Sequence, residues 1–168
     1  MTTPARGFAR PLLRHPAGWI ASGFGSGFAP VAPGTVGTLV ALLPWLALRE
    51  LPLLHYALVV LAAFALGVWT ANWVIRTIQV QDPSVVVWDE FVGVWITLAA
   101  APRGWVWIVA GFALFRLFDI WKPWPVRWAD SEVEGGLGAM LDDALAGLYG
   151  LIALQLLASG VGAAPYFG

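Results

Sequence analysis

The residues best suited to chemistry are five acids that flank apolar segments of the chain. Asp89 and Glu90 lie early in one apolar segment, Asp119 lies near the end of another, and Asp142 and Asp143 open a third. An unpaired charge at the centre of a membrane-spanning helix costs roughly 2.5–3.5 kcal/mol on insertion scales. We therefore expect these carboxylates near a membrane boundary, facing the protein interior and neutralised by a cation.

The stretch FRLFDIWKPWPVRWADSEVEGGLGAMLDD, Phe115–Asp143, concentrates charge in a chain with few charges. It holds six of the ten acidic and three of the nine basic residues, although only 11% of the chain is charged. Arg116 and Asp119 are three residues apart and share one face of a helix. Pro123 and Pro125 then end that helix. The stretch predicts two helix ends that face each other across a hairpin and present carboxylates and cations to one ligand.

A divalent metal ion is the cation that these acids favour. Adjacent acids such as Asp142 and Asp143 need a stronger cation than a basic side chain, and oxygen ligands without Cys or a nearby His favour Mg²⁺. The predicted ligands are Asp89, Glu90, Asp119, Asp142 and Asp143. We expect Lys122, with Arg116 or Arg127, to hold the remaining charge of a bound anion.

The acids also have purely structural explanations, which compete with metal binding. An acid pair at the start of a helix also caps the helix and compensates its dipole. Asp119 is different because an anion at a helix C-terminus is disfavoured by the dipole, so another group must stabilise it. The remaining acids of this region are interpreted as solvated loop residues: Asp82, Asp130, Glu132 and Glu134.

A glycine-rich segment, SGFGSGFAPVAPGTVGT at residues 22–38, is a second candidate binding element. Pro-Gly-Thr at a helix start leaves free N–H groups and a hydroxyl for an anion. The spacing fits neither a P-loop nor a dinucleotide-binding turn, and a turn without a ligand is an equal alternative. The predicted substrate contacts here are Gly25, Ser26, Gly34 and Thr35.

Composition indicates a membrane protein. The 168 residues are 60% hydrophobic, include 11 Trp and have a mean hydropathy of +0.77, more apolar surface than a soluble core of this size uses. The net charge of −1 argues against nucleic-acid binding. The absence of Cys excludes disulfides, thiolate catalysis and Cys-ligated zinc.

We predict an all-α, polytopic bundle of about five apolar helices, with residues 1–20 as a basic tail and residues 21–160 as one helical domain. The five segments are Val36–Leu48, Leu53–Ile75, Val85–Ala101, Trp105–Trp121 and Ala139–Ala158. The first, third and fourth are short for a full span, so we expect them to tilt, thin the bilayer or enter only part-way.

Charge asymmetry sets the expected orientation. With the N-terminus inside, seven basic residues fall on inner loops and two on outer loops, as the positive-inside rule requires. The inner ones are Arg6, Arg10, Arg14, Arg76, Arg116, Lys122 and Arg127, and the outer ones are Arg49 and Arg103. The acid motifs and the Pro-Gly-Thr turn then meet at the cytoplasmic boundary.

Four ordered motifs carry a family resemblance. GFGSGFAPVAPGTVGT, WDEFVGVWIT, FRLFDIWKPWPVRW and GGLGAMLDDALAG resemble those of the bacterial phosphatidylglycerophosphatase A family, over residues 21 to about 150. The resemblance implies a Mg²⁺-dependent lipid phosphatase of the bacterial inner membrane, with its active site on the cytoplasmic face. It also implies the last step of phosphatidylglycerol synthesis, in which phosphatidylglycerophosphate loses its terminal phosphate.

The residues suit that chemistry, because hydrolysis of a phosphomonoester depends on positioning, charge neutralisation and an activated nucleophile. One or two Mg²⁺ would activate a water, and an aspartyl nucleophile stays an alternative. Other functions remain open: an ion-coupled transporter, a phosphotransferase for CDP-activated lipids, or a non-catalytic scaffold. The first predicts an inverted repeat and the second a DGxxAR-type motif, and neither is present in the sequence.

Overall fold

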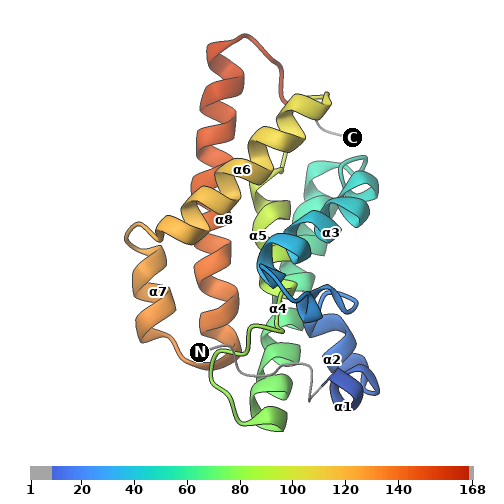
Figure 1. Cartoon of the computed structure of the whole chain (residues 1–168). Helices are drawn as coiled ribbons and strands as arrows, with labels where there is room; N and C mark the ends of the chain where they lie inside the picture. Colours follow the sequence, from blue (N-terminus) through green and yellow to red (C-terminus); the bar gives the residue numbers. More distant parts are fainter. Residues whose placement is uncertain (1–8, 167–168) are drawn as a thin grey trace.

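The structure is a computed structural model that describes residues 9–166, and all regular structure in this range is helical (Figure 1). The elements are α1 (Ala9–Leu13), α2 (Pro16–Ala21), the 3₁₀ turn η2 (Ser26–Phe28), α3 (Pro33–Leu48), α4 (Leu53–Ile78), α5 (Trp88–Thr97), α6 (Trp105–Trp121), α7 (Val126–Glu132) and α8 (Gly135–Gly160). The predicted all-helical class is confirmed.

Each of the five predicted apolar segments forms a helix, namely α3, α4, α5, α6 and α8. Among the described residues, two helices are long and apolar enough to cross a membrane: α4 and α8, of 26 residues each. The helix α3 is apolar but shorter, and α5 has only 10 residues, too few to span. The number of spanning helices and the cytoplasmic N-terminus therefore stay predictions.

Helix α5 lies at the centre of the bundle, where it contacts α3, α4, α6 and α8 (Figure 1). Small residues let α5 and α8 approach closely, as their spacing from the acids predicts. A side-chain carbon added at Gly147 would come within 2.5 Å of the Gly93 carbonyl oxygen, and one at Gly93 within 2.9 Å of the Asp143 carbonyl oxygen. This packing brings the acid pair of α8 next to that of α5.

The start of α8 corrects one expectation. The fifth apolar segment was predicted to begin at Ala139, but Gly135–Gly138 form the first turn of α8. The amide of Gly136 donates to Asn72 Oδ1 of α4 at 2.9 Å, and the absence of a side chain at Gly136 allows this contact. The glycines here serve close helix packing rather than flexibility, so Asp142 and Asp143 lie two turns inside the helix.

The predicted basic tail is also structured where it is described. Its residues from Ala9 onward form α1 and α2, and α2 packs against α4. His15 caps α2 by accepting from the Ala17 amide at 3.2 Å, and its ring stacks on Trp73 with centroids 4.2 Å apart. His15 therefore joins the start of α2 to Trp73 of α4. Arg6 lies outside the described residues.

Candidate active site

A cavity of about 560 Å³ lies where α3 and α5 begin, α6 ends, and α7 and the first turns of α8 close the wall. All five predicted metal ligands line it: Asp89, Glu90, Asp119, Asp142 and Asp143. Residues up to 54 positions apart in the sequence thus meet in one site, as the sequence predicted.

The cavity is strongly acidic. Its lining includes eight carboxylates, those of Asp82, Asp89, Glu90, Asp119, Asp130, Glu134, Asp142 and Asp143. It includes two cations, Arg116 and Lys122, which leaves a formal excess of six negative charges. Three acids interpreted as solvated loop residues, Asp82, Asp130 and Glu134, therefore belong to the cavity.

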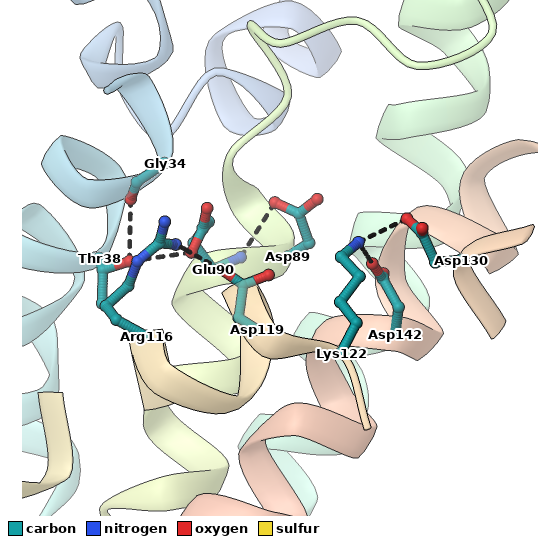
Figure 2. Close-up of polar contacts among 9 residues, drawn as sticks. All are labelled: Gly34, Thr38, Asp89, Glu90, Arg116, Asp119, Lys122, Asp130 and Asp142. Carbon is teal, nitrogen blue, oxygen red and sulfur yellow. Dashed lines mark hydrogen bonds and ion pairs between the residues drawn. The ribbon is translucent and has the colours of Figure 1, made fainter. Parts of the chain in front are cut away.

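Arg116 neutralises one wall, which we call the Arg116 wall and define by Thr38, Glu90, Arg116 and Asp119. Arg116 Nη1 lies 2.5 Å from Glu90 Oε2 and 2.7 Å from Asp119 Oδ2 (Figure 2). The Thr38 hydroxyl lies 2.9 Å from Glu90 Oε2 and 2.8 Å from the Gly34 carbonyl oxygen, and these two acceptors share its one proton. The guanidinium is the group that stabilises Asp119 at the C-terminal end of α6, where the helix dipole opposes an anion.

Lys122 connects the end of α6 to two other helices. It adopts a left-handed backbone conformation, with φ of 48°, that ends α6. Its Nζ lies 2.5 Å from Asp130 Oδ1 on α7 and 2.8 Å from Asp142 Oδ2 on α8 (Figure 2). Burial alone would lower the pKa of Lys122, but the hydrogen bonds and attraction of Asp130 and Asp142 outweigh it and raise that pKa.

Asp89 and Asp143 are the other two of the five acids that line the cavity, without a protein cation among the described residues, and we call them the open wall. Within residues 9–166 neither carboxylate has an ion-pair partner. Asp89 Oδ1 accepts from the Glu90 amide at 2.9 Å, and Asp143 is only 4% exposed. Burial, followed by repulsion from Glu90 and Asp142, raises the pKa of Asp89 well above its ordinary range. A cation beside this wall would remove that penalty.

The chemistry of these donors fits a hard divalent cation, because the cavity offers several carboxylate oxygens and neither Cys nor His. Their present arrangement is not a finished metal site. Among the described residues, no three acidic or histidine side chains converge as a ready coordination group. The protein cations hold Glu90, Asp119 and Asp142, which leaves the open wall as the place where a metal would find uncompensated oxygens.

The predicted substrate contacts divide into two groups. Gly34, Thr35 and Arg116 line the cavity. The other three, Gly25, Ser26 and Arg127, are not part of its lining. The Ser26 hydroxyl instead donates within its own turn, 2.8 Å from the Gly23 carbonyl oxygen, and the Arg127 side chain is exposed. Residues 22–31 therefore lie outside the cavity lining, and their turn η2 packs against α3.

Two residues that bind predicted site residues through hydrogen bonds were not themselves predicted as site residues. Thr38 lies one turn after Gly34 on α3, so helical spacing from the Pro-Gly-Thr turn is a signal that could have placed it near the site. Asp130 lies on α7, a helix that the sequence did not predict, and no spacing rule links it to Lys122.

The comparisons with known proteins identify the family of the chain. The family model described as Phosphatidylglycerophosphatase A matches residues 19–158, which include every residue of both walls. The chain belongs to the phosphatidylglycerophosphatase A family. This membership identifies it as a lipid phosphatase, a hydrolase of phosphoric monoesters.

Curated relatives cover most of the chain. It is 45% identical over 141 residues to phosphatidylglycerophosphatase A of Escherichia coli. The matched region covers 83% of this chain and 82% of that protein. The chain is 44% identical over 142 residues to the Haemophilus influenzae protein of the same name, covering 83% and 87%. A Bacteroides thetaiotaomicron protein with the provisional name phosphatidylinositol-3-phosphatase is 49% identical over 146 residues, covering 82% and 90%. No solved structure matches.

Proposed function

We propose that this member of the family hydrolyses the terminal phosphomonoester of phosphatidylglycerophosphate, giving phosphatidylglycerol and inorganic phosphate, and that it requires Mg²⁺. The observation that carries the proposal is one cavity with eight carboxylates, two cations and the Gly34-Thr35 turn. The names of the Escherichia coli and Haemophilus influenzae relatives supply the substrate.

Charge is the reason to propose a divalent ion. A phosphomonoester carries about two negative charges near neutral pH. Two protein cations that are already paired with carboxylates do not offset its repulsion from this cavity. We propose that Asp89 and Asp143 hold Mg²⁺ together with Asp119 and Asp142. When bound, the ion would screen the phosphate oxygens and lower the pKa of a bound water.

The side chains that hold the substrate come from three helices. Arg116 and Lys122 are placed to bind phosphate oxygens, because both line the cavity and carry fixed positive charge. The amides of Gly34 and Thr35 occupy the first turn of α3, where a helix has no acceptor for them. They would donate to the anionic head group at the positive end of the helix dipole.

The reaction replaces one P–O bond with another. A water oxygen attacks phosphorus, a carboxylate of the open wall takes a water proton, and the bond from phosphorus to the glycerol oxygen breaks. The departing glycerol oxygen then takes up a proton to become a hydroxyl. An attack by Asp89 or Asp143 itself, through a phospho-aspartyl intermediate, remains the alternative route.

The proposed location is the bacterial inner membrane, with several helices in the bilayer and the cavity on the cytoplasmic face. Two helices long and apolar enough to cross a membrane support the membrane part of this proposal. The distribution of basic residues supports the orientation. At that location the enzyme would catalyse the last step of phosphatidylglycerol synthesis.

A second substrate has one specific observation in its favour. The relative with the provisional name phosphatidylinositol-3-phosphatase is 49% identical to this chain. Phosphatidylinositol 3-phosphate is also a lipid phosphomonoester on a polyol head group, so the same cavity chemistry applies to it.

Phosphate release from purified protein in detergent tests both substrates. Phosphatidylglycerophosphate, phosphatidylinositol 3-phosphate, phosphatidic acid and lysophosphatidic acid would be compared with Mg²⁺ and then with EDTA. We expect the fastest release from phosphatidylglycerophosphate and its loss in EDTA. Faster release from another monoester would change the substrate, and release that is insensitive to EDTA would refute the metal requirement.

A further inference from the structure

Glu90 differs from the other predicted metal ligands because protein groups enclose its carboxylate. Oε2 lies 2.9 Å from the Thr38 hydroxyl and 2.5 Å from Arg116 Nη1. Oε1 lies against Gly34, where an added side-chain carbon would overlap it. The residue as a whole is 9% exposed. Both oxygens therefore contact the wall of the bundle.

These contacts join three helices that the sequence keeps far apart. Glu90 belongs to α5, Thr38 and Gly34 to α3, and Arg116 to α6. Figure 2 shows the Arg116 guanidinium next to Thr38 and the Glu90 carboxylate, with Asp119 on the same side of the guanidinium as Glu90. A metal ion bound to Oε2 would lie beside a guanidinium at hydrogen-bonding distance, and the two positive charges would repel each other. Asp119 pairs with the same guanidinium through Oδ2 alone, which leaves its Oδ1 for a metal, whereas Oε1 of Glu90 is packed against Gly34.

We propose that Glu90 is a positioning residue rather than a metal ligand. It fixes the plane of the Arg116 guanidinium and the Gly34-Thr35 turn on the cavity wall, and the Thr38 hydroxyl holds Glu90 in place. The proposal rests on the proposed function for the identity of the anion that Arg116 and the turn receive. It replaces the ligand role that the sequence suggested for Glu90.

The arrangement leaves Arg116 available to a substrate. Its Nη1 contacts both carboxylates, whereas Nη2 has no hydrogen-bond partner among residues 9–166, and the side chain lines the cavity. A guanidinium carries five N–H donors in a fixed plane, so fixing one nitrogen directs the others. Glu90 thereby determines where the remaining donors point.

A measurement of metal binding distinguishes a metal ligand from a positioning residue. Mn²⁺ binding to detergent-purified protein, followed by electron paramagnetic resonance, would compare wild type with Glu90→Gln and Asp143→Asn. A positioning role predicts that Glu90→Gln weakens Mn²⁺ binding by less than about tenfold, while loss of a ligand in Asp143→Asn weakens it by more than about 100-fold, beyond the loss typical of outer-shell partners. Equal weakening in the two variants would overturn the proposal.

Substitutions at Thr38 test whether its hydroxyl holds Glu90 in place, and they do so without removing a charge. Thr38→Val keeps the shape and removes the hydroxyl, and Thr38→Ser keeps the hydroxyl. Loss of a hydrogen bond to a charged group predicts a KM for the phosphomonoester about tenfold higher in Thr38→Val, with the half-saturating Mg²⁺ concentration unchanged. Thr38→Ser should stay within about threefold of wild type. Equal KM values in Thr38→Val and Thr38→Ser would contradict the positioning role.

The two experiments also separate this inference from the proposed function. A wild-type protein that binds no Mn²⁺ and works in EDTA would remove the metal from the mechanism. The role of Glu90 would then be judged by the Thr38 pair alone, since the hydroxyl contact does not depend on a metal.

Discussion

The two walls of the cavity use the same type of side chain for different purposes. On the Arg116 wall, Glu90 and Asp119 share one guanidinium at 2.5 and 2.7 Å. On the open wall, Asp89 and Asp143 have no ion-pair partner among residues 9–166. The first wall is neutralised by the protein itself. The second has no protein cation in this range, and we propose that it binds a cation from outside and is the place of the chemistry.

Asp89 and Glu90 show how adjacent residues take opposite roles. Neighbours on an α-helix point about 100° apart, because each turn has 3.6 residues. Glu90 consequently faces α3 and α6, where Thr38 and Arg116 receive it. Asp89 faces the cavity and makes only one side-chain hydrogen bond in the described part of the chain, with the amide of Glu90. Sequence adjacency therefore does not imply a shared ligand set.

The largest expected effect comes from breaking the open wall. Asp143→Asn keeps the shape of a buried side chain but removes a charge that no protein cation uses. We expect phosphate release to fall by more than about 100-fold, beyond the loss typical of outer-shell partners of a metal. The assay is release from phosphatidylglycerophosphate in detergent, with circular dichroism as the control for folding. A fully active Asp143→Asn enzyme would show that the open wall is not the reaction site.

A smaller effect is expected from a change that disturbs the Arg116 wall indirectly. Gly34→Ala places a carbon atom where Glu90 Oε1 now lies, so the carboxylate must move away from Thr38. We expect about tenfold weaker substrate affinity, because one hydrogen bond to a charged group is lost. We also expect overpacking to destabilise the fold by about 1–3 kcal/mol.

Gly160→Ala is the matched control for this change, because an added carbon there meets no atom within 4 Å. Its KM and melting temperature should equal those of wild type. If Gly34→Ala behaves like this control in both measurements, the contact between Gly34 and Glu90 has no role in substrate binding.

The smallest effect is expected at the rim between the walls. The Asp130 side chain is 44% exposed and shares Lys122 with Asp142. Exposed ion pairs contribute about 0.2–1 kcal/mol, so Asp130→Asn should change stability by less than about 1 kcal/mol and activity by only a few fold. Thermal unfolding and kcat/KM would measure both. A loss as large as that of Asp143→Asn would move Asp130 into the reacting centre.

The helices and the gathering of the acids could be predicted from the sequence, because both follow from hydrophobicity and charge alone. Long apolar runs that Pro and Gly interrupt predict helices, and five of them were found. The unfavourable free energy of a charge in lipid predicts that Asp89, Asp119 and Asp142 gather at one place, and they line one cavity. Neither inference needs the exact path of the chain.

The parts that failed depend on contacts between distant segments. Gly135–Gly138 is helical because Asn72, 64 positions before Gly136, accepts from its amide. Asp130 belongs to the site because α7 folds back over Lys122. Gly25 and Ser26 lie outside the cavity because their turn hydrogen-bonds within itself. Composition and spacing carry no information about such long-range partners.

The most direct test of the central claim is the binding of Mg²⁺ by titration calorimetry, with wild type compared with a variant that carries both Asp89→Asn and Asp143→Asn. If the open wall holds the metal, wild type binds at least about one ion and the double variant binds none in the same concentration range. Unchanged binding in a folded double variant would contradict the account.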